Sequence, residues 1–269
     1  VHAAPKRPVA TTDPALLPRL QALAARVQAY RERLSSISVT ETVTQHRLNT
    51  KMKPTGKPRV FVYDVTIMRV PGTDGEDIVR AERVLKLIDG KPPKRRDEPE
   101  CTDPESTYDD PLAFLLPESQ AKLAFRVAAA KGDGATLEFE QPEPEHLEVT
   151  PKKIAECFGI DGGREVGRIW LDKGTDDPLR IESSLAEPFP IFYDRLKDAS
   201  GNYMVVQHER TVITLAKVPF TDPEETLLLP ESKVSEYEIH GAGTPRLRTM
   251  QVFTNYKRFM TEYKIKGQE

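Results

Sequence analysis

The sequence predicts a mainly β protein of the α+β class, with about ten antiparallel strands and one amphipathic helix near the N-terminus. Three observations support this. Apolar residues recur at helical spacing near the start of the chain. Segments that alternate apolar and polar residues then follow one another, separated by turns rich in Pro, Gly and Asp. Helices do not alternate with these strands, which makes a parallel sheet a poor fit.

The predicted helix begins at Asp13, because an Asp in the capping position precedes Pro14 in the first helical turn. Apolar residues then recur every three or four positions, which places them on one face of the helix. They are Leu16, Leu20, Leu23, Val27, Tyr30 and Leu34. Such a stripe needs an apolar surface to cover, and the segments that follow are predicted to be sheet.

Alternation with period two predicts the strands. The first spans residues 36–48, with Ile37, Val39 and Val43 on one face and Ser and Thr residues on the other. The composition of the third, residues 79–89, also allows a helix. The other predicted strands are 59–70, the hairpins 124–131 with 135–140 and 168–172 with 179–183, and then 203–217, 227–229, 234–239 and 246–257.

Three further segments interrupt this pattern. Residues 90–110 are charged and rich in Pro, which predicts a long surface loop. Residues 111–117 form a short apolar segment bounded by prolines, which is expected to make one helical turn that anchors the loop. Residues 146–160 have an ambiguous pattern that predicts no particular element.

The chain is expected to form one domain over residues 13–269, preceded by a flexible segment over residues 1–12. The start is polar and rich in Pro and Ala, which is typical of an exported protein after its signal peptide has been removed. An arbitrary boundary of the sequence is the alternative. An apolar fraction of 38% is adequate for a core in a chain of 269 residues.

Composition disfavours two classes of partner. The 39 basic and 42 acidic residues leave a net charge of −3, which gives no bulk electrostatic reason to bind nucleic acid. No apolar run approaches the roughly 20 residues that a transmembrane helix needs. A basic and aromatic segment at residues 255–259 is better interpreted as a strand end with solvated cations than as a surface for stacking bases.

Motifs for catalysis or metal binding are absent from the sequence. The five His residues are scattered, and no phosphate-binding loop or GxSxG nucleophile motif occurs. We therefore expect no metal and no cofactor. Cys101 and Cys157 are a candidate disulfide pair in an exported chain, and two unrelated buried thiols are the alternative.

The hairpin formed by Gly167-Arg168-Ile169-Trp170-Leu171-Asp172 and Leu179-Arg180-Ile181-Glu182 resembles a recurring unit of the periplasmic outer-membrane lipoprotein carriers. In that unit a strand ends in an aromatic residue, an aliphatic residue and Asp, and a strand of alternating aliphatic and charged residues returns. The segment from Phe253 to Phe259 is similar to the ending of exported bacterial proteins that are grouped with lipoprotein-sorting factors. The order of elements fits over most of the chain.

This resemblance implies an open, curved antiparallel half-barrel whose concave apolar face is covered by helix. It also implies a non-enzymatic periplasmic or extracellular binding or carrier protein, with a lipid or a lipidated protein as its partner. Two alternatives stay open, namely a structural or interaction module of the cell envelope and a hydrolase whose residues converge only in the fold. The oligomeric state is left undetermined.

Four aromatic or aliphatic residues are candidates for lining such an apolar cavity. They are Phe61, Tyr63 and Ile67 on one face of the second predicted strand, and Trp170 in the hairpin. For Trp170, the sole tryptophan, ordinary packing in the core or on the sheet is the competing interpretation.

Overall fold

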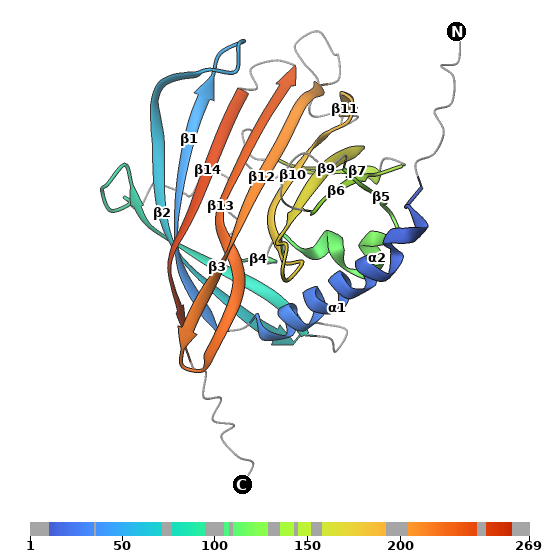
Figure 1. The fold of residues 1–269 in the computed structure, drawn as a ribbon. Helices are drawn as coiled ribbons and strands as arrows, with labels where there is room; N and C mark the ends of the chain where they lie inside the picture. The colour runs from blue at the N-terminus through green and yellow to red at the C-terminus, as the bar shows by residue number, and fades with distance from the viewer. Residues whose placement is uncertain are drawn as a thin grey trace, which may run out of the picture.

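The computed structural model describes residues 11–34, 36–71, 77–94, 105–107, 110–128, 135–142, 145–151, 158–191, 204–240 and 246–259. Figure 1 shows a strongly curved sheet with one long helix at its lower side. The chain is mostly strand, and this confirms the predicted fold class.

The N-terminal helix forms as its sequence predicts. Oδ1 of Asp13 accepts a hydrogen bond from the backbone N–H of Ala15 at 3.0 Å, which caps the turn η1 (Pro14–Leu16). The helix α1 (Leu17–Arg33) follows directly. All six residues of the apolar stripe are buried: Leu16, Leu20, Leu23, Val27, Tyr30 and Leu34. The stripe therefore belongs to the core, as the spacing indicated.

The predicted strands are present, most with shifted bounds, and four further strands that the sequence did not predict add to them. The strands are β1 (Ile37–Leu48), β2 (Pro54–Pro71), β3 (Asp77–Ile88), β4 (Glu105–Thr107), β5 (Ala124–Val127), β6 (Ala135–Glu140), β7 (Glu145–Pro151), β8 (Phe158–Gly163), β9 (Glu165–Leu171), β10 (Pro178–Leu185), β11 (Phe189–Ile191), β12 (Met204–Thr221), β13 (Glu224–His240) and β14 (Arg246–Arg258). The turn η2 (Ala113–Leu115) and the short helix α2 (Pro117–Gln120) precede β5.

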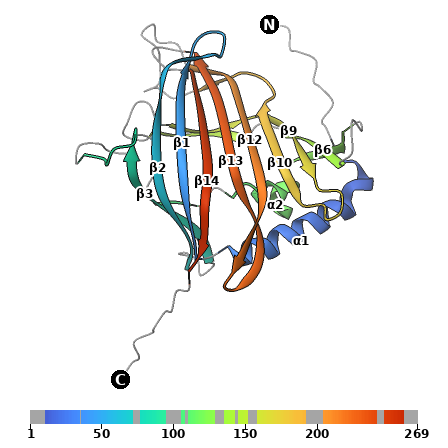
Figure 2. The ribbon, with the colours of Figure 1, turned by 60° about the vertical axis from the view of Figure 1, so that its left-hand side comes forward.

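Twelve of these strands form one antiparallel sheet. Its order is β4-β3-β2-β1-β14-β13-β12-β10-β9-β6-β5, and β11 also pairs with β12. The edge strands β4 and β5 do not pair with each other, so the sheet stays open (Figure 2). Strands β7 and β8 form a separate pair. The result is an open half-barrel in which the last strand, β14, pairs with the first strand, β1.

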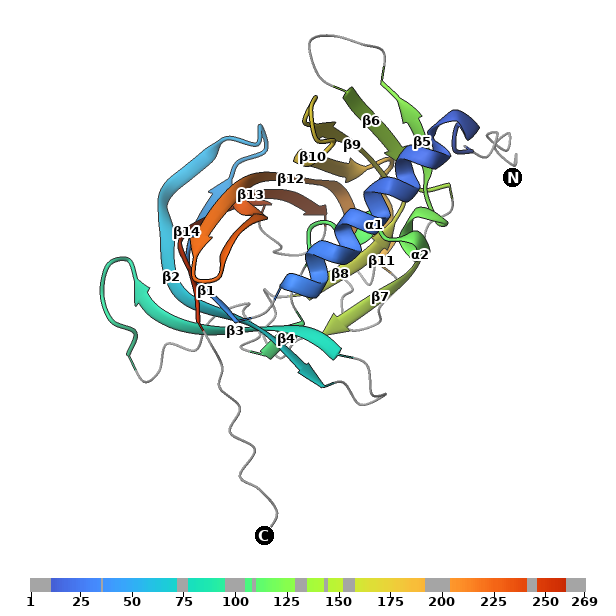
Figure 3. The same cartoon turned by 60° about the horizontal axis from the view of Figure 1, so that its bottom comes forward.

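The core lies on the inward face of this curve. Helix α1 crosses one mouth of the sheet, as Figure 3 shows, and its stripe packs in the same cluster as inward residues of β1, β2, β6, β9 and β13. Leu112, Leu115 and Leu116 of the segment around η2 are buried in that cluster too. The short apolar segment predicted at 111–117 therefore forms a helical turn that supports α1. Gln120 of α2 also donates a hydrogen bond from Nε2 to the carbonyl oxygen of Leu20 at 2.9 Å.

The hairpin β9–β10 contains a glycine for a packing reason. Gly167 lies opposite Phe139 of β6 in the register, and the ring of Phe139 covers the backbone at this point. A Cβ atom on Gly167 would lie 2.3 Å from Cζ of Phe139 and 2.3 Å from the carbonyl oxygen of Glu182. Only glycine fits there without movement of its neighbours.

On the outward face of the sheet, acidic and basic side chains form ion pairs across neighbouring strands. Glu138 pairs with Arg126 at 2.7 Å and with Arg168 at 2.9 Å. Further along the same face, the nitrogen–oxygen distances are 2.8 Å for Arg210–Glu182 and 2.6 Å for Arg248–Glu236. The outer surface is therefore polar while the inner one is apolar, which is the usual division for a sheet with one solvated face.

Some elements differ from the predictions. The segment predicted as a loop at 90–110 contains β4, which pairs with β3. Residues 227–229 and 234–239 belong to one continuous strand, β13, whose register shifts near Pro230 and so accommodates a residue without a backbone N–H. The ambiguous third segment is strand β3. Cys101, Cys157 and residues 1–10 lie outside the described residues.

Candidate functional site

The described residues line two cavities that are candidates for a functional site. The first, called here the sheet cavity, has a volume of about 160 Å³ and opens among β1, β2, β3, β12, β13 and β14. The second, called here the helix cavity, has a volume of about 540 Å³ and lies between α1, the segment before η2 and the β12–β13 hairpin. Both are candidates for the ligand site.

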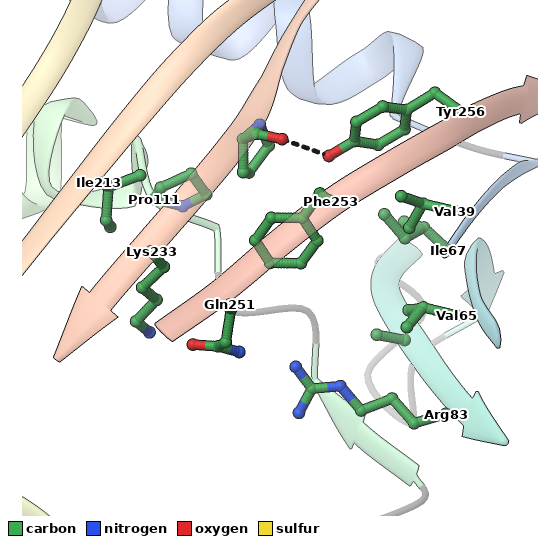
Figure 4. A pocket seen from close by; sticks show the side chains of 12 residues that line it. Val39, Val65, Ile67, Arg83, Pro111, Ile213, Lys233, Gln251, Phe253 and Tyr256 are labelled. Carbon is green, nitrogen blue, oxygen red and sulfur yellow. Dashed lines mark hydrogen bonds between the residues drawn. The ribbon is translucent and has the colours of Figure 1, made fainter. Parts of the chain in front are cut away.

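The sheet cavity has an apolar wall and a polar end. Its residues are Val39, Val65, Ile67, Ala81, Arg83, Pro111, Ile213, Pro230, Lys233, Gln251, Phe253 and Tyr256. Figure 4 shows the polar ends of Arg83, Gln251 and Lys233 gathered on one side of Phe253, while Tyr256 lies at the other side. Val39, Val65 and Ile67 form an aliphatic wall beside them. This division suits a molecule with one polar end and one apolar end.

A buried carboxylate lies behind the polar end. Glu41 of β1 has no exposed surface. Its Oε1 accepts a hydrogen bond from Nη2 of Arg83 at 2.9 Å and another from Nε2 of Gln251 at 2.6 Å. Both donors line the sheet cavity, so Glu41 fixes the orientation of two polar groups that a ligand would meet.

The ion pair between Glu41 and Arg83 is held by one hydrogen bond. Oε2 of Glu41 and Nε of Arg83 are both buried and have no hydrogen-bond partner within the part of the chain that the structure describes. A guanidinium and a carboxylate can form two parallel hydrogen bonds. Here one of them is made, and a buried donor and a buried acceptor are left over, which is costly unless something satisfies them.

The helix cavity is mainly apolar with a charged rim. The α1 residues Leu23, Val27, Ala29 and Tyr30 face Leu112, Leu227 and Leu228 across it, and the rim includes Arg26, Arg33, Asp177 and Lys217. Lys217 contacts Asp177 through Nζ and Oδ2 at 2.9 Å, and Arg26 lies 4.0 Å from Oδ1 of the same carboxylate. Burial raises the pKa of Asp177, but the hydrogen bonds from Lys217 and Thr175 and the nearby positive charges outweigh it and hold the pKa below its ordinary value.

Residues that are close together in sequence line the two cavities. Pro111 lines the sheet cavity, and its neighbour Leu112 lines the helix cavity. Leu228 lines the helix cavity, while Pro230 lines the sheet cavity. Tyr256 donates a hydrogen bond from its hydroxyl to the carbonyl oxygen of Pro230 at 2.6 Å, and this bond links β14 to β13 beside the sheet cavity (Figure 4).

The structure places the four predicted cavity residues differently. Ile67 lines the sheet cavity. Phe61 and Tyr63 are buried on the same face of β2 but are not among its lining residues. Trp170 lies on the face of β9 opposite the buried Ile169, with the guanidinium of Arg180 at 5.3 Å from its ring centroid. Their roles in ligand binding stay predictions.

The sequence interpretation missed the polar residues of the site. Glu41 could have been found, because it falls on the same period-two face as Ile37, Val39 and Val43. A carboxylate on an otherwise buried face needs a partner. Arg83 and Gln251 carry no such local signal, since they meet Glu41 only through the pairing of β1 with β14 and the neighbouring placement of β2 and β3.

Three carboxylates on the outer face of the sheet have shifted pKa values. Burial raises the pKa of Glu138, Glu182 and Glu238, but hydrogen bonds from Arg or His and the nearby positive charges outweigh it and lower each pKa, and all three belong to ion pairs. Among the described residues no group of three or more His, Cys, Asp or Glu is arranged to hold a metal ion. Within the same residues, no helix has the length and apolar character to cross a bilayer.

Comparison with known proteins gives weak structural similarity and no sequence match. No family model matches the chain, and no curated protein matches it. A LolA superfamily protein from Nitrosomonas europaea is similar over 93% of this chain and 97% of its own, with 8% identity and a TM-score of 0.37. The Pseudomonas aeruginosa MucA/MucB complex gives 87% and 94% coverage, 8% identity and a TM-score of 0.20. Both structural similarities are weak.

Proposed function

We propose that this chain is a non-enzymatic binding or carrier protein whose inner cavities take acyl chains of a lipid or of a lipidated protein. The observation that carries this proposal is the helix cavity of about 540 Å³ between α1 and the sheet. Its volume falls within the roughly 300–1,000 Å³ that is typical of small-molecule sites. A structural module without a ligand would instead be expected to have a filled interior.

Burial of apolar surface would drive such binding. Each methylene group moved from water into an apolar site contributes about 0.8 kcal/mol. The wall of the helix cavity supplies leucine and valine side chains from α1 and β13 for this purpose. These apolar contacts are not directional. The cavity therefore selects its ligand by the length and shape of the acyl chain, and not by the sequence of a protein attached to it.

Export to the periplasm or the extracellular space belongs to the same proposal. It is supported by the resemblance of the β9–β10 hairpin sequence to the lipoprotein carriers. Fractionation of native cells with an antibody against the chain is the direct test, and recovery in the cytoplasmic fraction alone would contradict this part of the proposal.

The binding test uses cis-parinarate, a naturally fluorescent fatty acid, and native mass spectrometry of protein purified without detergent. We expect saturable binding and a co-purified mass in the range of lipids. Leu228→Trp fills the helix cavity and is expected to weaken cis-parinarate binding by at least about tenfold. Leu17→Trp is the matched control, because Leu17 is exposed on the first turn of α1 and should keep the wild-type affinity.

Two results would overturn the proposal. One is the absence of both cis-parinarate binding and co-purified lipid in well-folded wild-type protein. The other is equal affinity in wild type, Leu228→Trp and Leu17→Trp, because cis-parinarate would then bind elsewhere. Thermal unfolding of each variant establishes that the comparison concerns folded protein.

A further inference from the structure

The turn between β1 and β2 concentrates positive charge. No Asp or Glu occurs between Glu41 and Asp64, whereas five basic residues do: Arg47, Lys51, Lys53, Lys57 and Arg59. With His neutral, this segment carries a formal charge of +5 while the whole chain carries −3, so the rest of the chain carries −8. The charge of the molecule is therefore unevenly distributed, although its sum is small. Residues 47–59 are called here the basic turn.

The charges of the basic turn are exposed and largely uncompensated. All five of its basic residues are exposed. Within the described part of the chain, four of them have no carboxylate partner: Arg47, Lys51, Lys53 and Lys57. Asp89 lies beside the basic turn, where its Oδ1 accepts a hydrogen bond from the N–H of Val60 at 2.8 Å, but the exposed Lys91 follows two residues later and offsets its charge. Glu238 of β13 is already in an ion pair with Arg246.

Hydrogen bonds to Asn49 fix the shape of the basic turn. The Oδ1 atom of Asn49 accepts a hydrogen bond from the backbone N–H of Lys51 at 2.9 Å and another from that of Lys53 at 3.1 Å. The backbone N–H of Asn49 donates to the carbonyl oxygen of Lys53 at 2.9 Å. The two lysines therefore project from an ordered backbone, so that little further ordering is needed when a partner binds.

The basic turn lies at the end of the sheet opposite α1 (Figure 1). Helix α1 leads into β1 at Ile37, whereas the basic turn follows the other end of β1, at Leu48. The helix cavity is lined by α1 and is therefore remote from the basic turn along the strands. A partner bound at the basic turn would leave the helix cavity uncovered.

The chemistry of the basic turn favours a bilayer surface over a nucleic acid. Three of its five cations are Lys, whose ammonium group is a hydrated point charge, whereas Arg is the residue suited to bidentate phosphate recognition. Residues 46–60 contain no aromatic side chain on which a base could stack. Lys and Arg near a surface of anionic lipids each strengthen binding by about fivefold, and this attraction requires no fixed geometry.

We propose that the basic turn docks the protein on an anionic phospholipid bilayer. The contact is electrostatic and peripheral, and it acts within about one Debye length of the surface, about 8 Å at physiological salt. This inference goes beyond the proposed function and does not depend on it, because the basic turn and the helix cavity lie at different ends of the sheet. Docking tethers the chain and keeps the helix cavity open to solvent.

Co-sedimentation of the full chain with large unilamellar vesicles tests this. One set of vesicles contains phosphatidylglycerol and phosphatidylcholine in equal parts, and the other contains phosphatidylcholine alone. We expect binding to the anionic vesicles and none to the neutral ones. Raising the salt concentration to about 1 M should abolish the binding, because the Debye length then falls to about 3 Å.

A triple variant locates the contact. Lys51→Gln/Lys53→Gln/Lys57→Gln should weaken binding to the anionic vesicles by about a hundredfold, since each lysine contributes about fivefold. Its affinity for cis-parinarate should equal that of the wild type, because the helix cavity is untouched. Thermal unfolding establishes that the variant is folded.

The matched control removes the same number of charges elsewhere. Lys122→Gln/Lys173→Gln/Lys257→Gln changes three exposed lysines outside the basic turn and lowers the net charge equally. It should bind the anionic vesicles nearly as tightly as the wild type. An equal loss in both triple variants would overturn the proposal, because binding would then follow the net charge and not the basic turn.

Other partners are decided by competition. Double-stranded DNA of mixed sequence represents nucleic acid, and poly-glutamate represents an acidic protein. If either binds more tightly than the anionic vesicles do and loses that affinity in the basic-turn variant, the bilayer is the wrong partner. Equal binding to neutral and anionic vesicles also overturns the proposal. Absence of cis-parinarate binding in a wild type that still binds anionic vesicles overturns only the proposed function.

Discussion

Arg83 of β3 donates a hydrogen bond from Nη2 to Oε1 of Glu41 at 2.9 Å on the inner face of the sheet. The carboxylate has no exposed surface, whereas the guanidinium reaches the sheet cavity. The pair thus joins the core to the candidate site. Removing one partner and removing both should have very different effects on stability.

Glu41→Leu is expected to destabilise the fold by about 1–3 kcal/mol, because Arg83 and Gln251 lose their shared acceptor. The double variant Glu41→Leu/Arg83→Leu should recover much of that loss, since two apolar residues replace the pair. Urea unfolding of Glu41→Leu, Arg83→Leu and the double variant measures the three free energies of unfolding. Strict additivity of the two single changes would show that the pair is not coupled.

The apolar stripe of α1 gives a second prediction. Leu20 is buried against the core, whereas Leu17, one turn earlier, is exposed. Leu20→Ala should lower the free energy of unfolding by about 2–5 kcal/mol. Leu17→Ala should change it by less than about 0.5 kcal/mol. Equal effects of the two substitutions in urea unfolding would mean that α1 does not pack on the sheet as described.

Gly167 and Gly174 provide a matched pair in the β9–β10 hairpin. A Cβ atom on Gly167 would collide with Phe139 and with the backbone of Glu182, whereas on Gly174 the nearest atom is Oδ1 of Asp172 at 3.5 Å. Gly167→Ala should therefore cost about 1–3 kcal/mol through overpacking. Gly174→Ala should be nearly neutral. Thermal unfolding compares them, and a stable Gly167→Ala variant would contradict the close approach of Phe139.

The ion pairs of the outer face make stability depend on pH. Desolvation raises the pKa of Glu182, but hydrogen bonds from Arg210 and Arg180 and their charges outweigh it, so its pKa lies below the ordinary value of 4.5. A carboxylate with a lowered pKa in the folded state contributes stability above its unfolded pKa. That contribution is lost as the pH falls from the unfolded value down through the folded one.

Glu182→Gln should therefore be less stable than wild type near neutral pH, and the difference should shrink as the pH falls below about 4.5. Unfolding free energies measured in urea over this range test the sign. High salt serves as the control, because screening weakens the same exposed pair. A difference that grows towards low pH would show that Glu182 is not stabilised as a carboxylate.

Much of the fold could be predicted because helical spacing and strand alternation are local patterns in the sequence. The stripe from Leu16 to Leu34 was identifiable because helix neighbours are three or four residues apart, and all six positions are buried. The strand β1 and the hairpin β9–β10 were predicted for the same reason, since alternation and turn residues are local properties. Where one face of a strand was clearly apolar, the sequence also predicted which face is buried.

The pairing of strands that lie far apart in the sequence could not be predicted. The contact of Gln251 with Glu41 depends on β14 lying beside β1, and no local pattern specifies that neighbour. Trp170 was an ambiguous candidate because an aromatic residue on a strand suits either face, and its direction is fixed only by the burial of Ile169 and Leu171 beside it. The polar end of the sheet cavity was missed because its residues come from three separate strands.

The pairing of β14 with β1 has a consequence for how the protein acquires its structure. Ile37 pairs with Arg258, so the centre of the sheet joins residues from the two ends of the described chain. Until β14 has emerged from the ribosome, β1 and β13 each lack one neighbour and the half-barrel cannot be completed. Contacts this distant in sequence slow folding. The core therefore stays unfinished until β14 has been synthesised, and the exposed strand edges would benefit from a chaperone during that interval.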